Sequence, residues 1–302
     1  MLHKTLTMIS AEPFCGKTLL MLAQAISLSS GKLLFGKYAP TELRRTLFIG
    51  QDAPTWDYAR QCIKLVRGYG ISAAELAELD TDLILNEGVF LNDKEFISWL
   101  RLWHEATQFE VLMLDTLASI HTMNENDNRE MSHIMGVLKA IRDEFGCAII
   151  FSHHTGKPSG EQVRSANYRS RGASAIPASV DFHFQLSRTA EDTVAITMPK
   201  GRGADDLDPP SAFTIVKSKD AEGNHSVRLE LADAVNSEVS EQLFALLVMR
   251  PRKRKELVDM VQTMRPNMDA DNVSKWVDNQ LQAWKRSGAI ESKERGIWEL
   301  CS

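Results

Sequence analysis

The most constraining feature of this sequence is the short segment AEPFCGKT, at residues 11–18. An apolar run (residues 6–9) precedes it, and a second apolar run (residues 19–22) follows it. A buried strand, a glycine-bearing loop and a helix in this order are typical of a phosphate-binding loop. Such a loop turns its backbone N–H groups and the positive end of the helix toward one point, where a polyphosphate fits. A surface turn that spells GKT by chance is the alternative.

Individual roles follow from this motif. Lys17 is expected to reach the outer phosphates of a nucleotide, and the Thr18 hydroxyl to hold Mg²⁺. Cys15 could have a redox role, although a variable filler position is the favoured interpretation. The predicted nucleotide-binding residues are Ala11, Glu12, Pro13, Phe14, Cys15, Gly16, Lys17, Thr18 and Leu19.

Composition restricts the class of protein. A chain of 302 residues can hold one large core and a small second domain. An apolar content of 43% with 25% charged residues is ordinary for a soluble protein. Four cysteines at scattered spacings fit neither a disulfide framework nor a zinc site. Because the sequence also has no signal-peptide pattern and no apolar run as long as a membrane span, we expect a cytoplasmic protein without membrane contact.

Strand and helix patterns alternate along the first half of the chain. Strands are predicted at residues 45–49, 80–86, 111–114 and 147–151, and helices at 56–67, 95–106 and 131–145. This alternation predicts an α/β fold with a mainly parallel central sheet. Four further strands, at 180–186, 193–198, 211–216 and 226–231, are expected to extend the sheet in an antiparallel manner.

Asp115 directly follows the apolar strand at 111–114. An acid at the carboxyl end of a strand, about 100 residues after a phosphate-binding loop, is the Walker B pattern, in which the carboxylate holds Mg²⁺. Asp115 is therefore predicted to share the metal with Thr18. An N-cap of a turn is the alternative role for this aspartate.

Polar residues also follow the strand at 147–151. The polar triplet Ser152, His153 and His154 is expected to point toward the γ-phosphate and to report its presence, with only one of the two histidines in that role. We predict His153 as this catalytic sensor and His154 as a residue that packs the loop. A zinc pair is disfavoured because no third ligand is nearby.

Two basic segments come next. Residues 158–171 combine arginines with one aromatic ring, which suits single-stranded nucleic acid, although a solvated surface loop fits equally well. The predicted DNA contacts in this segment are Arg164, Tyr168, Arg169 and Arg171. In the second segment, Lys200 and Arg202 lie on a glycine-bearing hairpin that could project toward a neighbouring subunit or simply form a charged turn.

The order of these motifs resembles the RecA-like hexameric ATPases, and most closely the RepA-like plasmid replicative helicases. The segments that carry the resemblance are residues 11–18, 48–60, 111–131, 147–157 and 170–176, with a looser match at 200–203. The resemblance implies a homo-oligomer, with a hexameric ring as the form typical of the family, and ATP between subunits. It further implies that Lys200 and Arg202 contact the nucleotide of the neighbour, and that a loop such as 158–171 lines a channel for single-stranded DNA.

One position departs from this family. Its members usually carry a glutamate after the second strand, where the side chain orients the attacking water, and here that position is Gln51 followed by Asp52. Glutamine can position water but cannot accept its proton. Either Asp52 replaces the glutamate, or hydrolysis is slow.

The C-terminal segment has a different pattern. We divide the chain into an ATPase domain (1–235) and a domain (236–302) with three predicted helices and a hairpin, which resembles a winged helix-turn-helix. Such a domain would place its third helix in the major groove of duplex DNA. Its predicted DNA contacts are Arg252, Lys253, Arg254, Lys255, Lys275 and Asn279. Since residues 236–302 carry 11 basic and 10 acidic side chains, packing on a protein partner is the alternative.

The sequence therefore predicts an ATPase that uses Mg²⁺ and acts on DNA, and the favoured interpretation is a replicative helicase of a mobile element. A DNA-bound ATP switch, such as a loader or regulator with slow hydrolysis, is the first alternative. A metabolic P-loop kinase is the second. The predicted catalytic residues are Lys17, Gln51, Asp52, Asp115 and His153.

Overall fold

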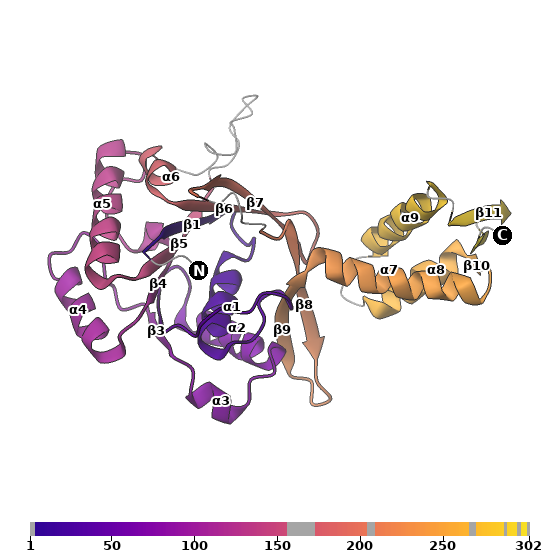
Figure 1. Ribbon diagram of the computed structural model, residues 1–302, viewed down its shortest axis with the longest axis horizontal. Helices are drawn as coiled ribbons and strands as arrows, with labels where there is room; N and C mark the ends of the chain where they lie inside the picture. The colour runs from indigo at the N-terminus through magenta and orange to yellow at the C-terminus, as the bar shows by residue number, and fades with distance from the viewer. Residues whose placement is uncertain are drawn as a thin grey trace.

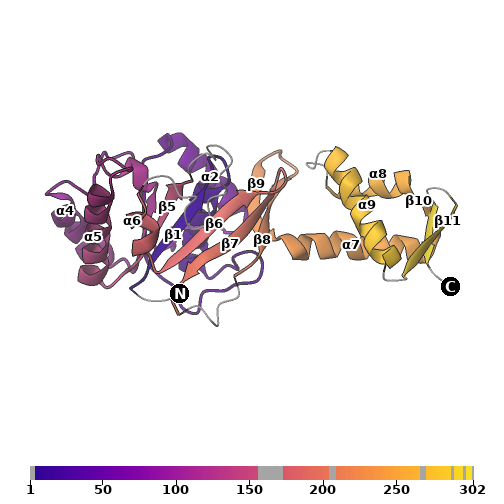
Figure 2. The same cartoon turned by 90° about the horizontal axis from the view of Figure 1, so that it is seen from above.

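The computed structural model describes residues 4–155, 173–203, 209–265, 270–286, 289–294 and 297–300. In this part of the chain a large α/β body is followed by a smaller helical body, and one helix runs from the first into the second (Figures 1 and 2). None of the helices in the described ranges is both long and apolar enough to cross a membrane.

A nine-stranded sheet forms the centre of the larger body, in the order β3-β2-β4-β5-β1-β6-β7-β8-β9. The strands are β1 (Leu6–Ala11), β2 (Thr46–Gly50), β3 (Thr81–Leu85), β4 (Val111–Asp115), β5 (Ala148–His154), β6 (Phe182–Arg188), β7 (Thr193–Gly201), β8 (Ala212–Lys219) and β9 (His225–Leu231). All neighbours from β3 to β6 pair in parallel, and those from β6 to β9 pair antiparallel. The sheet is thus mainly parallel, as predicted.

One strand departs from the sequence prediction. The segment at 180–186 was expected to run antiparallel, but β6 pairs in parallel with β1. A parallel neighbour requires a crossover connection, and among the described residues the helix α6 (Ala175–Ser179) lies between β5 and β6 in the chain. Only β7, β8 and β9 extend the sheet in the antiparallel manner that was predicted.

Helices pack against both faces of this sheet. The helices of the larger body are α1 (Lys17–Ser30), α2 (Thr55–Gly68), α3 (Ala73–Ala77), α4 (Phe96–Thr107), α5 (Asn128–Phe145) and α6 (Ala175–Ser179), with a 3-10 turn at Leu117–Ser119. One apolar cluster joins the sheet to α1 and α2, and a second joins it to α4, α5 and α6.

Successive residues of each strand alternate between these two clusters. On β4, Val111 and Met113 pack on the α1 side, whereas Leu112 and Leu114 pack on the α5 side. The alternation is the period of two of any β-strand. It continues to the strand ends, where it decides which face each polar side chain reaches.

The smaller body contains α7 (Ala232–Met249), α8 (Arg254–Met264) and α9 (Ala270–Arg286) with a three-stranded antiparallel sheet. The strands are β10 (Arg252–Lys253), β12 (Ile297–Leu300) and β11 (Ile290–Glu294), in that order across the sheet. A core of its own includes Leu243, Leu257 and Leu281, all fully buried. Because α7 begins at Ala232, the predicted boundary between residues 235 and 236 falls inside a continuous helix.

Candidate functional site

The segment at residues 11–18 connects β1 to α1, as the motif requires. Gly16 has φ +83° and is the N-cap of α1, a left-handed conformation that glycine adopts without steric cost. The helix begins at Lys17, so its first turn faces the loop. Cys15 is buried, whereas the Phe14 side chain is 93% exposed. The loop thus has the geometry of an anion-binding site at a helix N-terminus.

Lys17 lies folded against this loop. Its Nζ atom donates to the carbonyl oxygens of Ala11 (3.1 Å) and Glu12 (3.2 Å) and lies 3.2 Å from Nδ1 of His154. Burial lowers the pKa of Lys17, while the carboxylates of Asp115 and Asp52 oppose that shift. The ammonium group therefore stands where the carboxyl edge of the sheet meets the loop.

Asp115 is buried at the end of β4 and is surrounded by hydroxyl donors. Thr18 Oγ1 donates to its Oδ2 (2.7 Å), Ser152 Oγ donates to its Oδ1 (2.5 Å) and the Tyr58 hydroxyl lies 3.2 Å from Oδ2. Burial raises the pKa of Asp115, and the hydrogen bonds from Ser152 and Thr18 oppose this. Thr18 and Asp115, the two residues predicted to hold the metal, are therefore in direct contact.

Asp52 lies two residues after β2 and faces the same point. Its Oδ2 lies 3.6 Å from Nε2 of His154, and its Oδ1 accepts a long hydrogen bond from Thr116 Oγ1 (3.5 Å). The contact with His154 and the charge of Lys17 hold the pKa of Asp52 below its ordinary value, against the opposing effect of burial. An ionised carboxylate thus stands beside the lysine of the loop.

Gln51 does not face the loop. Its Nε2 donates to the carbonyl oxygens of Val89 (2.9 Å) and Ser119 (3.0 Å), and its Oε1 accepts from the N–H of Val89 (2.9 Å). The whole amide is engaged in joining two loops on the α5 side of the sheet. Of the two residues considered for the role of the missing glutamate, only Asp52 lies in the site.

The two histidines also point in opposite directions. His154 contacts Lys17 and Asp52, whereas His153 is fully buried, with its Nδ1 3.7 Å from Glu125 Oε1. The prediction chose His153 as the sensor, but the geometry favours His154 for that role. The cause is strand alternation: Ser152 and His154 share the α1 face, and His153 lies on the other.

Sequence reasoning missed Tyr58 altogether. Its ring is fully buried, its hydroxyl reaches Asp115 and it accepts a hydrogen bond from the N–H of Asp52 (3.2 Å). A Cβ on Gly50 would come within 2.7 Å of the ring, so glycine at the end of β2 makes room for it. The sequence signal that could have indicated Tyr58 is the glycine at the end of the second strand, eight residues before a tyrosine in the first turn of the following helix.

Lys200 and Arg202 lie at the end of β7 and just beyond it. Lys200 Nζ donates to the carbonyl oxygens of Pro177 (3.1 Å) and Ala178 (2.8 Å), and Arg202 contacts Asp181 at 3.1 Å with its side chain 70% exposed. The arginine thus remains accessible at the surface. The predicted contacts Arg164, Tyr168, Arg169 and Arg171 lie outside the described residues.

The predicted basic contacts of the smaller body divide into two groups. Arg254 forms a two-pronged ion pair with Asp278 (2.6 and 2.7 Å), and Arg252 lies 3.5 Å from Glu256 with its side chain 14% exposed. Both arginines therefore brace this body internally. The exposed members are Lys253, Lys255, Lys275 and Asn279.

Taken together, the sheet order, the loop between β1 and α1 and the acid at the end of β4 define a P-loop protein with a RecA-like ATPase core. Residues 1–160 match a family model described as an AAA domain (AAA_25), and since this is more than half of the chain, the protein belongs to that family. A solved structure titled "ATPase Domain of G40P" has the same fold, with a TM-score of 0.52 and 17% sequence identity. The match covers 74% of this chain and 84% of that one.

Proposed function

We propose that this protein hydrolyses ATP with Mg²⁺ and uses the reaction to act on DNA as a helicase-like motor. The observation that carries the proposal is the convergence of Lys17, Thr18, Asp115 and Asp52 at the carboxyl edge of the sheet. The AAA domain match supports the ATPase part. The DNA-acting part rests on the resemblance to RepA-like helicases and on the exposed lysines of the smaller body.

The residues present fit Mg²⁺. Thr18 and Asp115 offer hard oxygen ligands 2.7 Å apart, and no cluster of three or more His, Cys, Asp or Glu that could hold a metal occurs in the described ranges. Such a site suits an ion held by one or two protein oxygens together with phosphates of the substrate. When bound, the ion would neutralise charge on the β- and γ-phosphates.

The side chains then take distinct roles. Lys17 leaves its carbonyl contacts to bind the outer phosphates, which its position at the first residue of α1 allows. Asp52, ionised and beside Lys17, accepts the proton of the attacking water. His154, in contact with both, senses the γ-phosphate and passes its presence to β5.

Assembly and DNA binding complete the proposal. Arg202, exposed just beyond β7, would reach the nucleotide of a neighbouring subunit in a homo-oligomeric ring, while Lys200 ties the end of β7 to α6. The smaller body would act as a winged helix that binds duplex DNA through Lys253, Lys255 and Lys275. The most specific part of this proposal is that the protein replicates the DNA of a mobile element.

The test separates binding from turnover. Lys17→Ala should abolish binding of Mg-ATP, whereas Asp52→Asn should keep that binding and lower hydrolysis by roughly 100-fold or more, as expected for loss of a general base. Asp93→Asn, the same change at an exposed loop position, is the matched control and should leave both unchanged.

Wild-type behaviour distinguishes the alternatives. Turnover stimulated by single-stranded DNA supports the motor. Tight ATP binding with negligible turnover would instead indicate a DNA-bound switch. Phosphoryl transfer to a small acceptor, together with no DNA binding, would indicate a kinase. Retention of ATP by the Lys17→Ala variant would overturn the site itself.

A further inference from the structure

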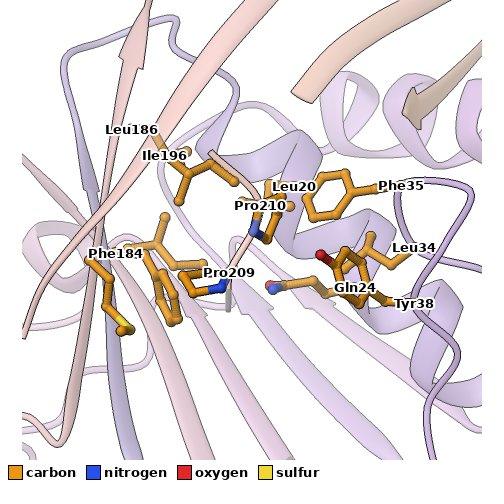
Figure 3. A pocket seen from close by; sticks show the side chains of 12 residues that line it. Leu20, Gln24, Leu34, Phe35, Tyr38, Phe184, Leu186, Ile196, Pro209 and Pro210 are labelled. Atoms are coloured by element: carbon orange, nitrogen blue, oxygen red, sulfur yellow. The ribbon is translucent and has the colours of Figure 1, made fainter. Parts of the chain in front are cut away.

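A cavity of about 260 Å³ lies beside α1 (Figure 3). Its walls come from separate parts of the chain: Leu20 on α1, Phe184 on β6, Ile196 on β7, the segment 34–38 and the pair Pro209–Pro210. Apolar and aromatic side chains make up nearly all of this lining. The cavity is therefore built like a site for an apolar ligand.

Gln24 is the exception in this lining. It lies on α1 two turns after Lys17, and its amide end points into the cavity among the apolar side chains (Figure 3). Its Oε1 atom is buried and has no hydrogen-bond partner in the part of the chain that the structure describes. Buried carbonyl oxygens are rarely left without a donor, because their loss of hydration is costly.

A buried water molecule needs two to four polar partners, and the polar side chains of the lining are Gln24 and Tyr38, which place a water at the low end of that range. A ligand with an apolar body and a single donor matches the lining better, because its body covers the aromatic walls and its donor reaches Oε1.

We propose that this cavity binds a small aromatic molecule that carries one N–H or O–H donor, with the donor directed at Gln24 Oε1. The volume is near the lower end of the range of ligand pockets, which suits a fused two-ring molecule of about ten non-hydrogen atoms. Because the walls come from several segments around one space, the occupant is a free small molecule rather than an extended peptide. This site does not depend on the function proposed above.

Indole and indene form a matched pair of probes, since they have the same shape and only indole carries an N–H. Titration of the full chain, followed by calorimetry or NMR, should show saturable binding of one indole and roughly tenfold weaker binding of indene, as expected for one net hydrogen bond. Gln24→Leu should remove this preference and Ile196→Trp, which fills the cavity, should abolish both. Asp93→Asn, at an exposed loop position, should bind indole as the wild type does.

Three results would overturn the proposal. These are no saturable binding of either probe, equal binding of both to the wild-type chain, and an indole preference that survives Gln24→Leu. The comparison on the wild-type chain requires no variant to fold. Binding of N-acetyltryptophanamide as tightly as indole would overturn the assignment to a free small molecule, because it would show that the cavity accepts a side chain attached to a peptide.

Discussion

The variant Gln51→Glu tests whether Gln51 or Asp52 takes the role of the water-orienting glutamate that RepA-like helicases usually carry after the second strand. If Gln51 oriented water, the acid would restore a general base and turnover would rise. In the structure, however, both amide protons of Gln51 are donated to carbonyl oxygens, those of Val89 and Ser119. A carboxylate has no protons to donate there. We therefore expect a less stable protein with turnover no higher than that of the wild type.

The magnitude follows from the contacts that are lost. Two hydrogen bonds at about 1 kcal/mol each disappear, and a carboxylate oxygen that faces two carbonyl oxygens adds about 1–3 kcal/mol. The new glutamate can avoid the charge repulsion by staying protonated, and this sets an upper limit on the loss of stability. A glutamate has a reference pKa of about 4.3, and each pH unit above it costs about 1.36 kcal/mol, so keeping the acid neutral at pH 7.5 costs about 4 kcal/mol. The expected loss is thus about 3–5 kcal/mol at pH 7.5.

The pH dependence has a defined sign. The two carbonyl oxygens that face the new glutamate raise its pKa in the folded state above its value in the unfolded state. The variant is therefore closest to wild-type stability at low pH, where the acid is protonated in both states, and loses stability as pH rises through the folded pKa. Urea unfolding at pH 5.5 and 7.5, followed by tryptophan fluorescence, measures this change.

Asn279→Asp is the control for this experiment. It makes the corresponding amide-to-acid change at an exposed position of α9 and should alter stability by less than about 0.5 kcal/mol. A Gln51→Glu variant that is as stable as the wild type and hydrolyses ATP faster would refute the reasoning, because Gln51 would then be free to act on water.

Three further predictions address other contacts of the site and of the smaller body. Tyr58→Phe keeps the buried ring but removes one donor to the carboxylate at the end of β4, so we expect roughly 1 kcal/mol lower stability and weaker Mg²⁺-dependent ATP binding, measured by titration with the metal. His154→Ala removes the main contact that lowers the pKa of Asp52; the acidic limb of the pH–rate profile should move to higher pH, and an unmoved limb would contradict this role. Lys255→Ala should reduce the slope of log affinity for duplex DNA against log salt by about 0.9, because one phosphate contact is lost. Arg254→Ala should leave that slope unchanged. It should instead lower the free energy of unfolding by about 1 kcal/mol or less, because the ion pair of Arg254 is half-exposed.

The order of elements could be predicted from the sequence because it depends on local patterns. Apolar runs of strand length, amphipathic runs of helix length and the GKT motif are each contained within about 20 residues, and the strands and helices they predict in the larger body are present. The proximity of Thr18 to Asp115 was also predictable, since Asp115 ends β4 and Thr18 lies in the first turn of α1, just after the loop that leaves β1 at the same edge of the sheet.

The direction of individual side chains was harder to predict. Gln51 and Asp52 are neighbours, as are His153 and His154, and in each pair one residue faces the loop while the other faces α5. The sequence shows that side chains alternate between the two faces of a strand, but it does not show where each strand ends and therefore how far the alternation continues. The strand β5 runs to His154 rather than to the predicted Phe151.

By itself, the sequence determined that this chain forms an α/β core with a phosphate-binding loop, because those features are written in contiguous residues. Tertiary structure alone decided which polar residues meet. Tyr58 joins Asp115 across 57 positions, and Arg254 pairs with Asp278 rather than remaining free for phosphate. Contacts of this kind depend on how helices and strands pack in three dimensions, which no pattern of neighbouring residues specifies.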